Sequence, residues 1–469
     1  MAIATQNPAT GETLKTFDEL SDAEVGERIA LAAASFATYR LTTFAERCHW
    51  MRRAAEILEA DADSVGELMV NEMGKTLGAA RAEVHKCASA CRYYAEHAEA
   101  FLADEPADAA AVGAEPADAA AVGAEAAYAC YQPLGVVLAI MPWNFPLWQA
   151  MRFAAPALMA GNVGLLKHAS NVPQTALYMQ ELFGRAGFPD AAFQTLLIGS
   201  AKVESILRDD RVVAATLTGS GPAGEAVAAI AGSEIKTTVL ELGGSDPFVV
   251  MPSADLAAAA KVAAKARCQN NGQSCIAAKR FIVHRDVADE FTSLFVGEMT
   301  SLVVGDPMAE GTDVGPLATE QGREDVEELV ADAVAKGAKV LCGGERPAGP
   351  GWYYPPTVVT AITPEMRMHT EEVFGPVASL YTVADIDEAV ALANATPFGL
   401  GSNAWTDDAD ERARFVRDLD AGMVFINGMV TSYPELPFGG VKGSGYGREL
   451  SAHGIREFCN LKSVWVGGQ

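Results

Sequence analysis

A cysteine in a polar, glycine-containing setting is the first feature of this sequence that could do chemistry. Cys275 ends the segment NNGQSC, which follows the helical stretch AAKVAAKARCQ. A nucleophilic thiolate needs exposure and nearby donors or dipoles that favour its charged form, whereas structural cysteines lie among apolar residues. The setting favours a reactive thiol at Cys275, and inert packing is the alternative.

Several polar side chains could assist such a nucleophile. Asn144 lies in PWNFP, where two prolines stiffen a turn after an apolar strand, so its amide could donate to an oxyanion or cap the following helix. Glu241 begins ELGGSDP at a predicted strand end, where a partly dry cleft would raise the pKa of its carboxyl and suit a general base. Glu371 and Glu372 lie beside Phe374 in EEVFGP. Exposed surface charge is the alternative for these glutamates.

A glycine-rich turn could bind phosphate. The segment GSGPAG, residues 219–224, lies between a strand-like and a helical run and matches G-x-G-x-x-G. Glu241 follows about 20 residues later, as the ribose-binding acid does in dinucleotide-binding motifs. The turn therefore indicates either dinucleotide binding or only a tight connection from strand to helix.

The elements that must position these residues are of the α/β type. Residues 21–101 carry Ala-, Glu- and Leu-rich stretches with helical spacing. From residue 134, short β-rich runs alternate with helical stretches, which is typical of βαβ units and a parallel sheet. Open sheets of this kind bind ligands at the carboxyl ends of their strands. A second α/β unit is predicted after about residue 244.

Composition limits the partners and the compartment. The 469 residues include 61 acidic and 35 basic side chains, a net charge of -26 that excludes nucleic acid and either maintains solubility or reflects a high-salt cytoplasm. The 8 cysteines show no paired CxxC spacing, so we expect no disulfide scaffold, no metal site and a reducing cytoplasm. The N-terminal segment lacks a basic region followed by an apolar core, so neither a signal peptide nor a membrane anchor is predicted.

One segment is repeated letter for letter. EPADAAAVGA at 105–114 recurs at 115–124 and has too little apolar bulk to form a core element. We interpret it as an expanded surface loop, with a functional linker as the alternative.

Taken in order, the motifs PWNFP, LTGS, ELGG, GQSC, EEVFGP and PFGGVKGSGYGRE resemble those of the aldehyde dehydrogenase superfamily. The resemblance runs from about residue 5 to the end, with the repeat as the main departure. It implies an α/β fold with a variant Rossmann domain that binds NAD or NADP, a catalytic domain, and a small oligomerisation element with a C-terminal arm, in a homodimer or homotetramer. The NAD(P)-binding domain is expected at 1–107 and 133–243, and the catalytic domain at 244–430. The oligomerisation element and C-terminal arm are expected at 108–132 and 431–469.

The resemblance also assigns roles. It implies that Cys275 attacks an aldehyde carbonyl, that the Asn144 amide and the Cys275 backbone N–H hold the oxyanion, and that Glu241 activates the hydrolytic water. Glu241 would then be a base and not a ribose anchor. The product would be a carboxylic acid together with a reduced cofactor.

The same resemblance implies a set of cofactor contacts. Ser170 stands where members that prefer NAD often carry Glu, so a 2′-phosphate would meet a hydroxyl and Lys167 in place of a repelling carboxylate. We therefore expect NADP to be accepted, alongside NAD. The expected cofactor-binding residues are Trp143, Lys167, Ser170, Gly219, Ser220, Gly224, Glu372 and Phe374.

Substrate is inferred from the closest branch. The segments MPWNFPLWQAMRFAAPALMAGN and GQSCIAAKRFIV are similar to bacterial and archaeal succinate-semialdehyde dehydrogenases. This implies that Arg152 and Ser432 bind the substrate carboxylate, although Arg152 could instead pack or pair structurally, and a further family position that can be Arg is Gln269 here. The alternatives are broad oxidation of neutral aldehydes and a catalytically silent, cofactor-binding structural protein.

Overall fold

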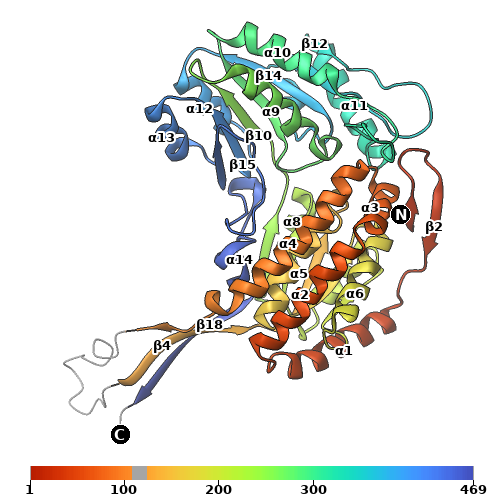
Figure 1. The fold of residues 1–469 in the computed structure, drawn as a ribbon, viewed down its shortest axis with the longest axis vertical. Helices are drawn as coiled ribbons and strands as arrows, with labels where there is room; N and C mark the ends of the chain where they lie inside the picture. Colours follow the sequence, from red (N-terminus) through yellow and green to blue (C-terminus); the bar gives the residue numbers. More distant parts are fainter. Residues whose placement is uncertain (1, 108–123, 468–469) are drawn as a thin grey trace.

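The structure is a computed structural model that describes residues 2–107 and 124–467. Most of the repeated segment lies outside these residues. The expected α/β architecture is confirmed, since two mainly parallel sheets are each covered by helices (Figure 1). Within the described ranges, the helices are all too short or too polar to span a bilayer.

The N-terminal region is helical, as its spacing predicts. A hairpin of β1 (Ile3–Gln6) and β2 (Thr13–Phe17) precedes the helices. Ser21 starts the first helix with a capping box, in which its hydroxyl and the Glu24 carboxylate each accept from the other residue's N–H. The helices are α1 (Asp22–Tyr39), α2 (Phe44–Ala60), α3 (Ala62–Met73) and α4 (Leu77–Phe101).

The first large sheet has six strands in the order β17-β9-β8-β5-β6-β7. All are parallel except β17, which runs antiparallel to β9. Its strands are β5 (Val136–Met141), β6 (Val163–His168), β7 (Phe193–Thr195), β8 (Val212–Thr218), β9 (Thr237–Glu241) and β17 (Gly445–Tyr446). Its helices are α5 (Trp148–Ala160), α6 (Pro173–Ala186), α7 (Val203–Leu207) and α8 (Gly221–Ser233).

Apolar sequence explains the burial of this unit. Every residue of α5 is buried, because the helix packs on β5 and β6 and is itself covered by α2 and α4. The runs VVLAIM and VGLLKH are almost continuously buried, as expected for central parallel strands. This sheet and its helices form one continuous core.

The second sheet has seven strands in the order β12-β13-β14-β11-β10-β15-β16, parallel except for the edge strand β12. Its strands are β10 (Asp246–Val250), β11 (Ala278–His284), β12 (Lys339–Cys342), β13 (Thr357–Thr360), β14 (Val377–Val383), β15 (Gly401–Trp405) and β16 (Met423–Ile426). Its helices are α9 (Leu256–Cys268), α10 (Ala288–Ser301), α11 (Glu320–Ala335), α12 (Ile386–Asn394) and α13 (Ala409–Asp418). The second α/β unit predicted after residue 244 is therefore present.

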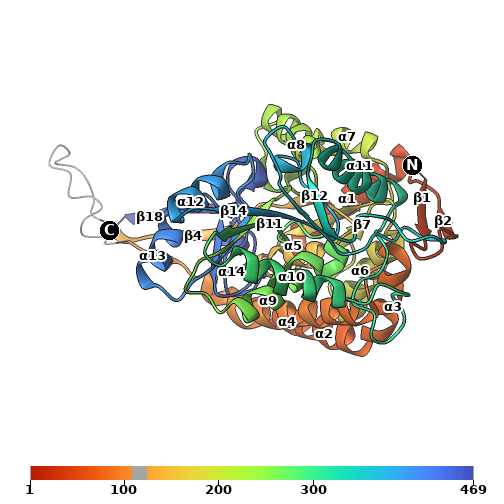
Figure 2. The ribbon, with the colours of Figure 1, turned by 90° about the horizontal axis from the view of Figure 1, so that it is seen from above.

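A third, small sheet projects away from both units (Figures 1 and 2). It has the order β18-β4-β3, with β3 (Glu105–Pro106), β4 (Ala124–Pro133) and β18 (Cys459–Gly467). The short helix α14 (Ser451–Arg456) leads into β18. The chain before β18 does not belong to this small sheet throughout, because β17 (Gly445–Tyr446) pairs with β9 of the six-stranded sheet. The three domain ranges remain predictions.

Candidate active site

Parallel strands bring several predicted residues to one edge of the six-stranded sheet. Neighbouring strands β9, β8, β5 and β6 end at Glu241, Thr218, Met141 and His168. The turns that follow carry Asn144, Ser170 and the segment 219–224. Lys167 is the second-last residue of β6. Residues spread over about a hundred positions in sequence therefore share one edge, which is where open α/β sheets bind ligands.

Cys275 reaches this edge on a loop built by side-chain amides. After α9 the chain makes a short 3₁₀ turn, Gln269–Gly272, in which Asn270 and Asn271 adopt left-handed φ angles of 53° and 57°. Asn270 Nδ2 donates to Asn144 O at 2.6 Å, and Asn271 Nδ2 donates to Gly74 O at 2.8 Å. These bonds offset the energetic cost of two left-handed residues. They fix the loop to the turn after β5 and to the residue that follows α3.

A cavity of about 230 Å³ opens beside the Cys275 thiol. Helices α4 and α5 and the loop before Cys275 supply most of its wall. Its volume suits a short aldehyde and exceeds that of a few waters. The lining residues are Ala79, Ala82, Glu83, Lys86, Phe145, Trp148, Gln149, Arg152, Gln269, Asn270, Ser274, Cys275, Ile276, Thr431, Ser432 and Phe438.

The Cys275 thiol is only partly exposed. Burial raises its pKa to about 12, while the nearby charges of Arg152 and Lys279 oppose that rise. The thiol is therefore protonated near neutral pH, and its activation requires a base or a bound ligand that changes its surroundings. Lys279, which the sequence analysis missed, donates to the Cys275 carbonyl at 2.9 Å and so holds the loop.

Asn144 is buried and is not among the residues that line the cavity. Its Nδ2 donates to Gln273 O at 3.1 Å, which orients the amide and leaves its second N–H hydrogen available. The alternative of a helix cap is wrong, because α5 begins after Leu147 and has no side-chain cap. The Cys275 backbone N–H has no acceptor among the described residues, so it too is free to donate.

Glu241 ends β9, as predicted, and is also buried outside the cavity wall. Burial and the neighbouring carboxylate of Glu449 raise its pKa well above the usual value, against the lowering influence of Arg152 and Arg448. Neither oxygen of its carboxyl has a hydrogen-bond partner in the described chain. A buried carboxyl with a raised pKa holds its proton, and it can act as a general base only after it ionises.

Two cations and a hydroxyl also line the cavity, at Arg152, Lys86 and Ser432. Arg152 is buried and forms an ion pair of 2.7 Å with Glu449, while its Nη2 has no hydrogen-bond partner in the described chain. Ser432 Oγ accepts from Lys86 Nζ at 2.7 Å and from Trp148 Nε1 at 3.0 Å. The cavity thus brings together both residues predicted to bind a carboxylate.

Lys86, Glu83 and Glu449 were missed by the sequence analysis. Lys86 and Glu83 are charged residues that share one face of α4 with Ala79 and Ala82, and all four line the cavity. That spacing of three and four residues was the available signal: charged side chains on an otherwise alanine-rich helical face.

The predicted cofactor residues fit a dinucleotide. Helix α8 starts at Gly221 without a side-chain cap from Ser220, and no hydrogen bond or ion pair of the Lys167 ammonium is present in the described chain. A free helix N-terminus and an unpaired lysine suit phosphate groups. A Cβ at Gly224 would lie 2.6 Å from the Leu242 side chain, so glycine permits the close packing of α8 against the end of β9.

Two further cofactor residues lie on the loop before β14. Glu372 is half-buried and pairs with Lys279 at 3.0 Å, whereas Glu371 is exposed and pairs with Arg367 at 2.8 Å. The surface-charge alternative therefore holds for Glu371 and is wrong for Glu372. The rings of Trp143 and Phe374 meet edge to face at 5.7 Å, so both predicted aromatic residues lie together.

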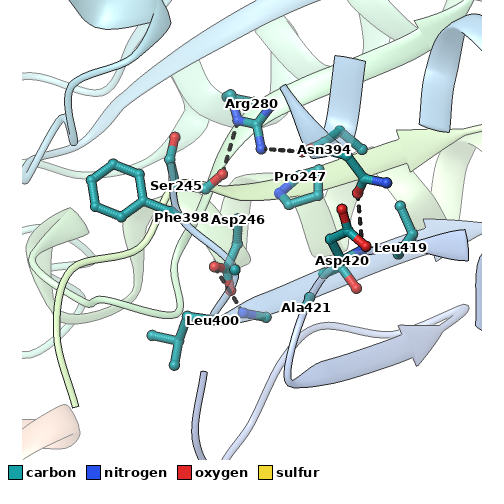
Figure 3. Close-up of a pocket in the computed structure, with 14 residues that line it drawn as sticks. Ser245, Asp246, Pro247, Arg280, Asn394, Phe398, Leu400, Leu419, Asp420 and Ala421 are labelled. Carbon is teal, nitrogen blue, oxygen red and sulfur yellow. Dashed lines mark hydrogen bonds between the residues drawn. The ribbon is translucent and has the colours of Figure 1, made fainter. Parts of the chain in front are cut away.

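A second cavity lies within the second α/β unit, beside the start of β10, and Cys275 is not among the residues that line it (Figure 3). Arg280 Nε donates to Ser245 O at 2.9 Å, and Asp246 Oδ1 accepts from Gly401 N at 3.1 Å. Burial raises the pKa of Asp246 to about 7. At about 10 Å³ this cavity has room for roughly one water, so it is too small for a substrate site.

Comparison with known proteins adds an independent line of evidence. The family model described as "Aldehyde dehydrogenase family" matches residues 1–464. The chain is 66% identical over 466 residues to "Succinate-semialdehyde dehydrogenase [NADP(+)] 1" of Mycobacterium tuberculosis (strain ATCC 25618 / H37Rv), covering 99% of this chain and 100% of that protein. It is also 66% identical over 468 residues to "Succinate-semialdehyde dehydrogenase [NADP(+)]" of Mycobacterium avium (strain 104), covering 100% of this chain and 97% of the relative.

Solved structures agree with these relatives over the full length. The succinic semialdehyde dehydrogenase of Streptococcus pyogenes in complex with NADP+ superposes with a TM-score of 0.94 at 36% identity, covering 100% of both chains. The succinate-semialdehyde dehydrogenase of Burkholderia pseudomallei gives a TM-score of 0.94 at 36% identity, covering 100% of this chain and 95% of that one.

Proposed function

The chain belongs to the aldehyde dehydrogenase family, and we propose that it oxidises succinate semialdehyde to succinate with NADP, or NAD, as the hydride acceptor. One observation carries the choice of substrate. A single cavity holds the Cys275 thiol together with Arg152 and Ser432, which can recognise a carboxylate. The names of the mycobacterial relatives and the NADP+ complex of the Streptococcus pyogenes enzyme support the same substrate and cofactor.

The chemistry begins at Cys275. Its Sγ forms a bond to the aldehyde carbon as the thiol proton passes to solvent water, and the carbonyl oxygen becomes an oxyanion in a thiohemiacetal. The free N–H of the Asn144 amide and the Cys275 backbone N–H stabilise that oxygen. Gln273 O orients the Asn144 amide, and Lys279 holds the Cys275 carbonyl, before the substrate arrives.

A bound dinucleotide would supply the hydride acceptor. The residues proposed to hold it are Trp143, Lys167, Ser170, Gly219, Ser220, Gly224, Glu372 and Phe374. Loss of hydride from the thiohemiacetal leaves a thioester on Cys275. Glu241, once ionised, takes a proton from water as the water oxygen bonds to the thioester carbon. The carbon–sulfur bond then breaks, which releases succinate and restores the thiol.

Assembly and location are part of the proposal. We infer a homodimer or homotetramer in which the β18-β4-β3 arm contacts another copy, because its Leu461 and Trp465 side chains are exposed. A cytoplasmic location is supported by the absence of disulfides, since all eight cysteines lie in the described chain and are free. Light scattering in solution tests the assembly, and a monomer mass would overturn it.

The test of the function is reduction of NADP, and separately of NAD, by the purified protein with succinate semialdehyde in low-salt and high-salt buffers. We expect turnover that is lost in Cys275→Ala and a preference for the semialdehyde over butanal, a neutral aldehyde with the same number of carbons. A preference for butanal would favour the broad detoxifying alternative. No turnover of any aldehyde would favour a silent, cofactor-binding protein.

A further inference from the structure

We propose that Lys86 supplies a further positive charge that binds the substrate carboxylate, with the Ser432 hydroxyl as a donor beside it and in addition to Arg152. The inference rests on the proposed function, because it concerns the same cavity and the same anionic substrate. Neither the motif resemblance nor the sequence analysis points to Lys86.

The charges around the cavity favour this assignment. Arg152 is paired with Glu449, and Lys75 is paired with Glu83, so both pairs are close to neutral overall. Lys86, in contrast, has no carboxylate within ion-pair distance in the part of the chain that the structure describes. A carboxylate at Arg152 would share that guanidinium with Glu449 and contact its unpartnered Nη2, whereas Lys86 adds a charge that no carboxylate neutralises.

The hydrogen bonds of Ser432 point the same way. A serine oxygen accepts through two lone pairs and donates one hydrogen. Lys86 Nζ and Trp148 Nε1 both donate to Ser432 Oγ, which occupies its acceptor capacity. No acceptor for the Ser432 hydroxyl hydrogen is present among the described residues, and Ser432 lines the cavity. The hydroxyl is thus left as a donor beside the Lys86 ammonium.

The surroundings hold the ammonium in place. Lys86 Nζ lies 4.4 Å from the centre of the Trp148 ring, an arrangement in which the aromatic face attracts the cation. Helix α4 carries Lys86 and packs directly on α5, which carries Trp148 (Figure 1). The lysine is therefore positioned by two packed helices and not by a loose surface chain.

The charge of Lys86 depends on pH. Burial, with a further contribution from Arg152, lowers its pKa to about 8, while the thiol of Cys87 and the carboxylate of Glu83 act in the opposite direction. The ammonium is mostly charged near neutral pH and becomes neutral above about pH 8. Because the whole chain carries a net charge of -26, a local cation is needed to bring an anion into the cavity.

The experiment compares semialdehyde and butanal kinetics in wild type, Lys86→Met, Lys86→Arg and the control Lys339→Met, which alters an exposed lysine on β12. In Lys86→Met we expect the ratio of kcat/KM for the semialdehyde to that for butanal to fall about 10- to 100-fold, mainly through KM. Lys86→Arg keeps the charge and should retain most of the preference. Lys339→Met should match wild type.

The outcomes are distinguishable. A wild-type enzyme without preference for the semialdehyde overturns the proposed function and this inference together. A wild-type preference that survives in Lys86→Met overturns the inference alone.

A second measurement uses only wild type, so it does not depend on how a variant folds. Succinate and butyrate are compared as inhibitors of butanal oxidation across the pH range around 8. We expect the advantage of succinate over butyrate to decline as Lys86 loses its proton. An advantage that is constant with pH overturns the inference, because the loss of the Lys86 proton would then leave succinate binding unchanged.

Discussion

The guanidinium of Arg152 and the carboxylate of Glu449 form an ion pair of 2.7 Å, and both side chains are almost fully buried. The Arg152 guanidinium also lies 4.3 Å from the centre of the Phe438 ring. Glu449 in turn raises the pKa of Glu241. The pair therefore connects the wall of the substrate cavity to the proposed general base.

Loss of this pair should be costly. Glu449→Gln leaves a buried arginine without its counter-ion, and we expect a loss of about 3–5 kcal/mol in the free energy of unfolding. The measurement is denaturant unfolding. Glu56→Gln is the matched control, because it removes an exposed pair with Arg53 worth less than about 1 kcal/mol. An equal loss in the free energy of unfolding in the two variants would show that the buried pair stabilises the fold no more than the exposed pair does.

Turnover should increase with pH where hydrolysis limits it. The raised pKa of Glu241 means that its carboxyl is protonated at low pH and becomes a base only as pH rises through that value. We expect kcat to rise with pH in wild type. In Glu241→Gln, rapid mixing should show a single burst of reduced cofactor followed by little turnover. Steady turnover without a burst in that variant would remove Glu241 from hydrolysis.

The Asn144 amide should act on the transition state. Asn144→Ala removes one oxyanion donor, so we expect kcat to fall about 10²- to 10³-fold with a smaller change in KM. Gln321→Ala on α11 removes an exposed amide and serves as the control. Steady-state kinetics with the preferred aldehyde gives both constants. A change confined to KM would indicate that Asn144 contributes to binding only.

Cofactor choice should respond to one side chain after β6. Ser170→Glu places a carboxylate where we expect the 2′-phosphate, so KM for NADP should rise about 10-fold or more while KM for NAD changes little. Lys167→Ala should also weaken NADP more than NAD. The measurement is kcat/KM for each cofactor at a fixed aldehyde concentration. Equal effects on both cofactors would place the 2′-phosphate elsewhere.

Much of the fold follows from local patterns. The run VVLAIM predicts a buried strand, and β5 occupies it, because continuous apolar sequence needs cover on both faces. The stretches REDVEELVADAVAKG and DIDEAVALANA predict helices, and α11 and α12 begin with side-chain caps from Thr319 and Asp385. Such signals lie within a few residues of one another, so they can be read without knowing the fold.

The candidate site could be predicted in part. The chemical types at Cys275, Asn144 and Glu241, in the order of the family motifs, indicated the nucleophile, the oxyanion donor and the base. Their separation did not matter, since each motif contains the local geometry that its residue needs: a strand end for Glu241 and a turn after a strand for Asn144.

What the sequence alone determined was therefore the class of fold and the family, and from the family motifs it predicted the nucleophile. Only the tertiary structure decided which charged side chains are paired with an opposite charge inside the protein. Arg152 and Glu449 are far apart in sequence and pair across the fold, whereas Lys86 and Ser432, 346 residues apart, meet at 2.7 Å. The reason is physical: the energy of a charge depends on its burial and on its nearest partners, and both are set by packing between helices and loops that no local pattern records.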